Sequence, residues 1–331
     1  MAETAALNRR VARLCRGPTA EVAASIFAAA AVGVFWSICV ALGFRPWLAV
    51  ALTVLFAFGS ENFAISSQGL YQHGPGSLAL LCAIRAFLAL QSRRKTAALF
   101  VGLFLALAVA IRINNLLLAV PIGVAVLFQQ PRLWQLLLVA PTLVAVLLVG
   151  YNETVFGSFL GGGQRETGNL AVANIPSGLL GSFFSPARGL FLYFPAALLA
   201  LIVVSQRAGS LWHDPLFFAL GLSILLVTLL NSSFKIWYGG HSFGPRYFTE
   251  VQAPILILLG VSLETSGLRS GVVAACLALI IPYSVFVQTM GTFNDATMVW
   301  NAFPTNVDQD RSRLWDWSDN PIFRGLRVKS R

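Results

Sequence analysis

The loop at residues 231–250 (NSSFKIWYGGHSFGPRYFTE) contains the densest group of chemically useful side chains in the sequence. Arg246 carries a permanently charged fork that can hold a phosphate through two hydrogen bonds. Trp237 offers an aromatic face, and His241 a hydrogen-bonding ring, to a sugar. Apolar runs at 216–230 and 251–263 flank the loop, so the pattern predicts a site for a polar headgroup or a sugar at a membrane surface. The alternative is interfacial anchoring by the same aromatic and basic residues.

Two other segments carry similar residues. Residues 66–77 (SSQGLYQHGPGS) contain Gln72 and His73, which can hydrogen-bond sugar hydroxyls, and the histidine could also move a proton. The alternative for this segment is the polar start of a helix. Arg112 lies beside Asn114 and Asn115 between two apolar runs, where it could bind a lipid phosphate or extend its side chain to water.

The segment 151–188 supplies further candidates. Arg188 begins another apolar run, and is either a phosphate ligand or an interfacial anchor. Glu153 and Glu166, together with Glu250 of the first loop, are the candidate proton acceptors near the membrane level. The glycine triplet 161–163 matches no nucleotide-binding motif, because no strand precedes it and no Gly-Lys-Ser/Thr follows it.

Composition places all of these segments in a membrane protein. The 331 residues are 57% hydrophobic and only 11% charged, with a mean hydropathy of +0.74, whereas soluble chains are about a quarter charged. The apolar runs are continuous rather than alternating, which predicts an all-α transmembrane bundle and not a β-barrel. The net charge of +10 suits anionic lipids and an anionic ligand. The sequence shows no basic cluster on a soluble fold, so a nucleic acid partner is not expected.

No metal or disulfide framework is predicted. The three histidines are too scattered for a zinc site, and the four cysteines show no paired spacing. Asp308 and Asp310 could hold a divalent cation if they share a loop, although a solvated tail explains the same spacing. No cofactor is otherwise expected.

Ten apolar segments are expected to cross the membrane, within a bundle at residues 1–290 that precedes a polar tail at 291–331. They cover residues 22–42, 47–65, 76–91, 97–112, 115–129, 134–150, 189–205, 215–231, 249–264 and 271–290. With ten spans, short basic loops alternate with loops rich in Gly, Pro, His and Trp, so all of the elaborate loops fall on one face. The basic loops indicate the cytoplasm, which places the elaborate face and the tail outside.

Six stretches of the chain resemble the bacterial integral-membrane proteins of the GT-C glycosyltransferase superfamily. They are SSQGLYQHGP (66–75), AVAIRINNLLLAVP (108–121), YNETVFGSF (151–159), SPARGLFLYFP (185–195), WYGGHSFGPRYFTE (237–250) and WNAFPTNVDQDRSRLWDW (300–317). The resemblance implies a multi-pass enzyme of the bacterial inner membrane that uses a polyprenyl-phosphate-linked sugar at the extracytoplasmic face. In that superfamily an acidic loop follows the first span, and residues 1–20 resemble only the end of such a loop. The first span and most of that loop are therefore expected to be missing.

The preferred hypothesis is transfer of a sugar from a polyprenyl-phosphate donor to a lipid, glycan or protein acceptor. Arg112, Arg188 and Arg246 are the candidates for phosphate contact, and Gln72, His73, Trp237 and His241 for sugar contact. Two alternatives stay open: a transporter or flippase of lipid-linked sugars, which would need polar residues near the membrane midplane, and a membrane scaffold without catalytic activity.

Overall fold

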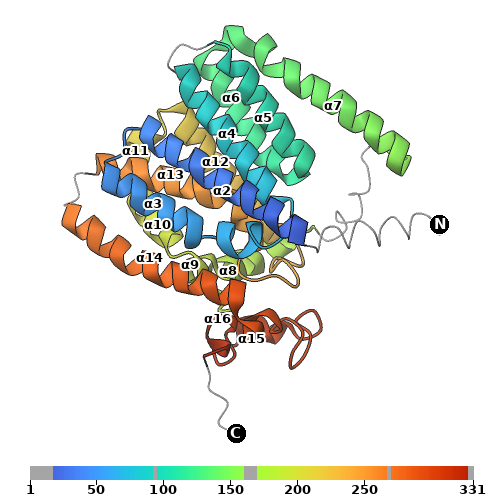
Figure 1. Ribbon diagram of the computed structural model, residues 1–331, viewed down its shortest axis with the longest axis vertical. Coiled ribbons are helices and arrows are strands. Elements are labelled where there is room, and N and C mark those ends of the chain that lie inside the picture. The colour runs from blue at the N-terminus through green and yellow to red at the C-terminus, as the bar shows by residue number, and fades with distance from the viewer. Residues whose placement is uncertain (1–17, 92–94, 160–169, 267–269, 327–331) are drawn as a thin grey trace.

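The computed structural model describes residues 18–91, 95–159, 170–266 and 270–326. Within these ranges the regular secondary structure is helical (Figure 1). The only extended pairing in the described part of the chain is an isolated bridge between Leu170 and Phe234. The longer helices are α2 (Pro18–Ala41), α3 (Pro46–Phe58), α4 (His73–Gln91), α5 (Ala97–Ile111), α6 (Leu116–Gln129), α7 (Trp134–Phe156), α8 (Ile175–Phe184), α10 (Ala196–Ser205), α12 (Pro215–Ser233), α13 (Thr249–Thr265) and α14 (Ser270–Phe293). Short helices are α9 (Leu190–Tyr193), α11 (Ala208–Leu211), α15 (Asp295–Met298) and α16 (Pro321–Arg324).

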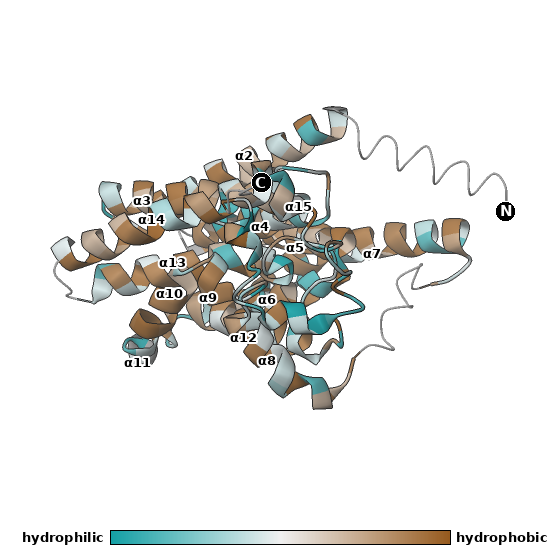
Figure 2. Ribbon diagram, turned by 90° about the horizontal axis from the view of Figure 1, so that it is seen from below, coloured by the Kyte–Doolittle hydropathy of each residue, from teal (hydrophilic) through white to brown (hydrophobic). Residues whose placement is uncertain are grey.

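Six helical segments are long and apolar enough to cross a membrane. They are Thr19–Ala41, His73–Leu90, Pro131–Phe156, Pro215–Ser233, Arg246–Thr265 and Gly271–Phe293. Five further apolar helical segments are shorter: Pro46–Phe58, Ala97–Ile111, Ile113–Gln129, Val172–Phe184 and Ala196–Ser205. Figure 2 shows hydrophobic colouring over most of the helices, with the hydrophilic residues gathered mainly in the segments between them. The all-helical membrane architecture expected from composition is therefore present.

Two of the apolar runs are not single helices. The run at 47–65 is helical only to Phe58, and a separate π-helical turn, η1, covers Asn62–Ser66. The run at 189–205 is divided at Phe194 and Pro195 into α9 and α10, because proline has no N–H to continue the helical ladder. The segment 151–188 also contains α8, a helix that the sequence analysis did not anticipate.

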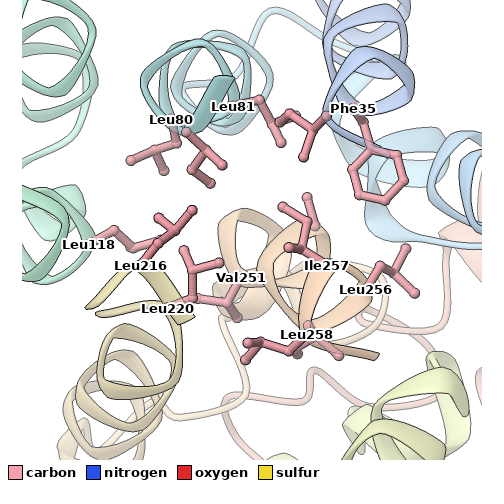
Figure 3. Close-up of a cluster of buried hydrophobic side chains, with 14 of the residues drawn as sticks. Phe35, Leu80, Leu81, Leu118, Leu216, Leu220, Val251, Leu256, Ile257 and Leu258 are labelled. Carbon is pink, nitrogen blue, oxygen red and sulfur yellow. The ribbon is translucent and has the colours of Figure 1, made fainter. Parts of the chain in front are cut away.

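Helix α13 is the centre of the bundle. Nearly all of its residues from Thr249 to Leu263 are buried. Figure 3 shows Val251, Leu256 and Ile257 of α13 facing leucines of α4, α6 and α12 and Phe35 of α2. Burying a side chain of this size stabilises a soluble fold by roughly 1.5–3 kcal/mol, but within lipid the gain comes mainly from close packing.

The connecting segments meet at two ends of the bundle. At one end, Arg45 pairs with Glu264 (Nε–Oε2 2.9 Å), and Arg207 donates a hydrogen bond to the carbonyl of Ser266. At the other end, contacts join the starts of α4, α6 and α13, the segment before α9, and the tail. We call these the plain end and the loop end, respectively.

Helix α7 and the tail differ in how they contact the bundle. The buried side chains of α7 are only Leu137 and Ala140, and its C-terminal half runs away from the other helices (Figure 1). The tail, in contrast, is anchored by Trp300, which is fully buried and donates a hydrogen bond from Nε1 to the carbonyl of Asp319 (2.6 Å). Leu314 and Val307 pack with Ala187 around the same tryptophan.

Candidate functional site

His73, Arg112 and Glu250 form a buried polar cluster at the loop end. His73 begins α4, Arg112 follows the last residue of α5, and Glu250 lies in the first turn of α13. Glu250 Oε1 is 3.0 Å from His73 Nδ1 and 2.8 Å from Arg112 Nη1, and the glutamate is only 4% exposed. A charge buried this deeply must be paired or hydrogen-bonded, and here two groups do so. The cluster thus ties the starts of α4 and α13 to the α5–α6 turn.

A small recess lies against this cluster. Asn115, which is buried, donates a hydrogen bond from Nδ2 to the carbonyl of Ala108 (2.9 Å) and so fixes the turn beside Arg112. The lining residues are Arg112, Asn114, Asn115, Leu117, Leu118, Val227, Leu230, Asn231, Tyr247 and Glu250. This recess, which we call the Glu250 recess, is therefore lined by both polar or charged residues and apolar ones.

A second small recess shares Tyr247 with the first. Its lining residues are Ser182, Arg188, Trp237, Tyr238, Pro245, Arg246, Tyr247 and Phe248, and we call it the Arg246 recess. Two predicted phosphate ligands and one predicted sugar ligand therefore line a single small space. The indole of Trp237 lies directly over Gly181 of α8, where a Cβ would overlap the ring.

Tyr247 lines both recesses, and two guanidinium groups lie near its ring. The guanidinium carbon of Arg112 lies 6.0 Å from the centroid of its ring, and that of Arg246 lies 5.7 Å away. Asn231 Nδ2 donates a hydrogen bond to the carbonyl of Tyr247 (2.9 Å), which holds this residue against α12. Arg246 makes no ion pair within the described part of the chain, and its Nε is buried without a hydrogen-bond partner there.

Arg188 is a structural member of the site as well as a lining residue. It is 2% exposed, and its Nε donates a hydrogen bond to the carbonyl of Tyr238 (3.1 Å) while Nη1 donates to the carbonyl of Ala187 (2.7 Å). Nη2 donates to Asn301 Oδ1 of the tail, and the guanidinium carbon lies 5.4 Å from the Trp300 ring centroid. Arg188 thus joins three segments around one buried charge.

His241 and Gln72 lie at the margin of the site. His241 is exposed, with Nε2 3.0 Å from Asn306 Oδ1 and 3.3 Å from Asp308 Oδ2. Asp308 also accepts a hydrogen bond from the Tyr238 hydroxyl (2.6 Å), and burial raises the pKa of that hydroxyl to about 12. Gln72 is exposed beside His73. Neither His241 nor Gln72 lines either recess.

The sequence analysis did not single out Glu61, which lies against the loop at residues 231–250. Glu61 is fully buried, and neither carboxylate oxygen accepts a hydrogen bond from the described residues. Gly244 covers it, because a Cβ there would overlap Glu61 Oε1 and the Tyr193 ring. The backbone N–H of Glu61 donates a hydrogen bond to Gln252 Oε1 of α13 (2.8 Å). The available signal was an acidic residue inside an apolar run, which in membrane proteins indicates a functional position.

The other predicted acids lie elsewhere. Glu153 is exposed in the last turns of α7, and Glu166 lies outside the described residues. Asp310 accepts hydrogen bonds from Ser312 of the same turn and so caps it, whereas Asp308 faces Tyr238. Among the described residues no group of three His, Cys, Asp or Glu side chains is arranged to hold a metal ion.

Comparison of the chain with protein-family models, with curated proteins and with solved structures finds no match. The functional reading of the site therefore rests on its own chemistry.

Proposed function

We propose that this protein is a glycosyltransferase that moves a sugar from a polyprenyl-phosphate donor to an acceptor hydroxyl. The observation that carries the proposal is the placement of Arg246 and Arg188 around one recess whose other lining residues include Trp237, Tyr238, Tyr247 and Phe248. Guanidinium groups recognise phosphate, and aromatic faces suit sugar rings. The same combination was expected from the sequence, and the resemblance to the GT-C superfamily supports the same function.

In this proposal the donor phosphate binds Arg246, whose Nε has no protein partner among the described residues. Arg112, whose guanidinium also lies near the Tyr247 ring, adds positive charge that stabilises the departing phosphate. Arg188 is already held by Tyr238, Ala187 and Asn301, so its role is to fix the recess. Trp237 supplies the flat surface for the sugar, while the exposed Gln72 and His241 contact a bound glycan nearer the rim, and buried His73 holds Glu250 in place.

Glu61 is the proton acceptor in this scheme. The acceptor oxygen attacks the anomeric carbon, the bond from that carbon to the phosphate oxygen breaks, and the proton passes to the Glu61 carboxylate. Glu250 suits this task less well because Arg112 and His73 already occupy one of its oxygens. In this scheme Glu61 becomes accessible when Gly244, which packs on its carboxylate, moves aside.

The proposal includes the membrane arrangement. The six long helical segments provide six spans. Helices α3, α5 and α6 provide three shorter spans, and α9 and α10 together provide the tenth. The plain end faces the cytoplasm, and the loop end faces outward from a bacterial inner membrane. The surrounding lipids and the lipid-linked sugar are then the partners of the protein.

The test is transfer by the purified full chain in liposomes that contain a polyprenyl phosphate carrying a radiolabelled hexose. Movement of label into a new lipid, glycan or protein product supports the proposal. Glu61→Gln should lower the rate by about a hundredfold or more, and Arg246→Gln should do the same by weakening donor binding. Lys235→Gln is the matched control, because Lys235 lies exposed in the same loop. Unchanged transfer by Glu61→Gln would remove Glu61 from the mechanism, and unchanged transfer by Arg246→Gln would remove the phosphate site.

A further inference from the structure

A groove far from the candidate site opens between α2, α4 and α5. It has a cavity volume of about 360 Å³, and its lining residues are Val34, Ser37, Cys82, Arg85, Ala86, Ala89, Thr96, Ala97, Phe100 and Phe104. Its walls are mostly apolar, with a half-buried arginine from α4 and an exposed threonine at the start of α5. The groove is therefore amphiphilic, with one cationic position in an apolar channel.

Arg85 makes no hydrogen bond or ion pair within the described part of the chain. A guanidinium at the depth of a membrane helix is costly unless an anion, a carbonyl or water contacts it. The Thr96 hydroxyl, which lines the same groove, likewise makes no hydrogen bond within the described residues. Both groups are available to a ligand oxygen.

The groove is separate from both recesses of the loop end. Helices α4 and α5 run in opposite directions, and the candidate site uses His73 at the first residue of α4 and Arg112 just after α5. Arg85 is twelve residues further along α4 than His73, which corresponds to about 18 Å of helix. Phe100 and Thr96 lie in the first turn of α5 or just before it. The groove thus belongs to the plain-end half of the bundle.

We propose that this groove binds one anionic glycerophospholipid of the surrounding bilayer. The phosphate diester contacts the Arg85 guanidinium and accepts a hydrogen bond from the Thr96 hydroxyl. The acyl chains lie along Phe100, Phe104 and Val34. Arg85 lies six residues before the end of α4, and its long side chain can reach the headgroup level from there.

Charge complementarity favours this occupant over a zwitterionic lipid. A phosphatidylglycerol-type headgroup carries a net negative charge that Arg85 alone can neutralise. A zwitterionic headgroup brings a second positive charge next to the guanidinium. Exposed Lys95 beside the groove adds to the local attraction for anionic lipids.

The experiment counts lipids retained by the full chain. The protein is reconstituted in nanodiscs of phosphatidylcholine with increasing phosphatidylglycerol, released, and analysed by native mass spectrometry. The wild-type chain should keep one phosphatidylglycerol in preference to phosphatidylcholine. Arg85→Gln should weaken this retention by about tenfold or more, since a charge-assisted hydrogen bond is lost. Arg132→Gln removes the same charge from an exposed position outside the groove and should leave retention unchanged.

Two further measurements guard against a folding defect in Arg85→Gln. Ala86→Leu fills the groove without changing its charge and should also release the lipid. Cys82 lines the groove, so phosphatidylglycerol should slow its alkylation in the unmodified protein, as read by peptide mass spectrometry, while alkylation of Cys276 in α14 is unaffected. Equal retention of the two lipids, tighter retention of a polyprenyl phosphate, or Arg85→Gln behaving like Arg132→Gln would each overturn the proposal.

Discussion

Gly244 packs directly against the carboxylate of Glu61. A Cβ at position 244 would overlap Glu61 Oε1 and the ring of Tyr193, and the glycine has a φ of 59°. The contact joins the loop before α13 to the turn that follows α3, two segments more than 180 residues apart in the sequence. It also keeps water from a carboxylate that has no hydrogen-bond partner among the described residues.

Replacing this glycine should therefore cost more than backbone strain alone. Gly240→Ala is the matched control, because Gly240 has a φ of 65° and open space around its Cβ position. The control should lose about 1–2 kcal/mol of unfolding free energy from the left-handed conformation. Gly244→Ala should lose roughly 1–3 kcal/mol more from overpacking. Denaturation of both variants in the same detergent gives the comparison, and equal losses would contradict the packing of Gly244 on Glu61.

Removing the carboxylate of Glu250 should leave Arg112 without its partner. We expect Glu250→Gln to lower the unfolding free energy by about 3 kcal/mol, the cost of breaking a buried ion pair. Arg112→Gln in the same background should restore part of the loss, with a coupling energy of about 1–3 kcal/mol. The four proteins of this cycle are compared by detergent denaturation. Strictly additive losses would show that the pair does not interact in the folded protein.

Arg246 should distinguish phosphate binding from interfacial anchoring. Arg246→Lys keeps the charge but loses the planar fork, and we expect its affinity for a polyprenyl phosphate to fall by about tenfold. Arg246→Gln should lose more, and Lys235→Gln should change little because Lys235 is exposed. Binding is measured by titration in detergent micelles. If Arg246→Lys lowers expression and leaves the affinity intact, Arg246 is an anchor and not a ligand.

The orientation of the protein can be tested with single added cysteines. Lys235 is exposed at the loop end and Ser312 in the tail, and each is replaced by cysteine. Gln130 and Gln206, which are exposed in connections at the plain end, are replaced by cysteine in two further variants. An impermeant maleimide applied to intact cells should label the first two above the wild-type background and should spare the other two. The reverse pattern would place the loop end in the cytoplasm, where it could not meet a donor on the outer face.

The sequence revealed the chemistry of the site more readily than its contacts. His73, Arg112 and Glu250 could each be read as polar groups beside an apolar run, but their meeting joins positions up to 177 residues apart. Glu61 escaped notice because one carboxylate hardly lowers the hydropathy of the run at 47–65, and its relation to Gly244 exists only in the folded chain.

Helix boundaries followed the apolar runs except where local backbone chemistry intervened. Pro195 divides a run that hydropathy alone reads as one helix. Helix α8 was hidden because it is only 10 residues long and contains one proline and two glycines, Pro176, Gly178 and Gly181.

The position of Tyr247 has a thermodynamic consequence. Its ring is a wall of both recesses and lies against both Arg112 and Arg246. A ligand that displaces Tyr247 in one recess also changes the lining of the other, so the two occupancies should be linked. Linkage is reciprocal. If a molecule in the Glu250 recess changes the affinity of the Arg246 recess for its ligand by some factor, that ligand changes the affinity of the Glu250 recess by the same factor.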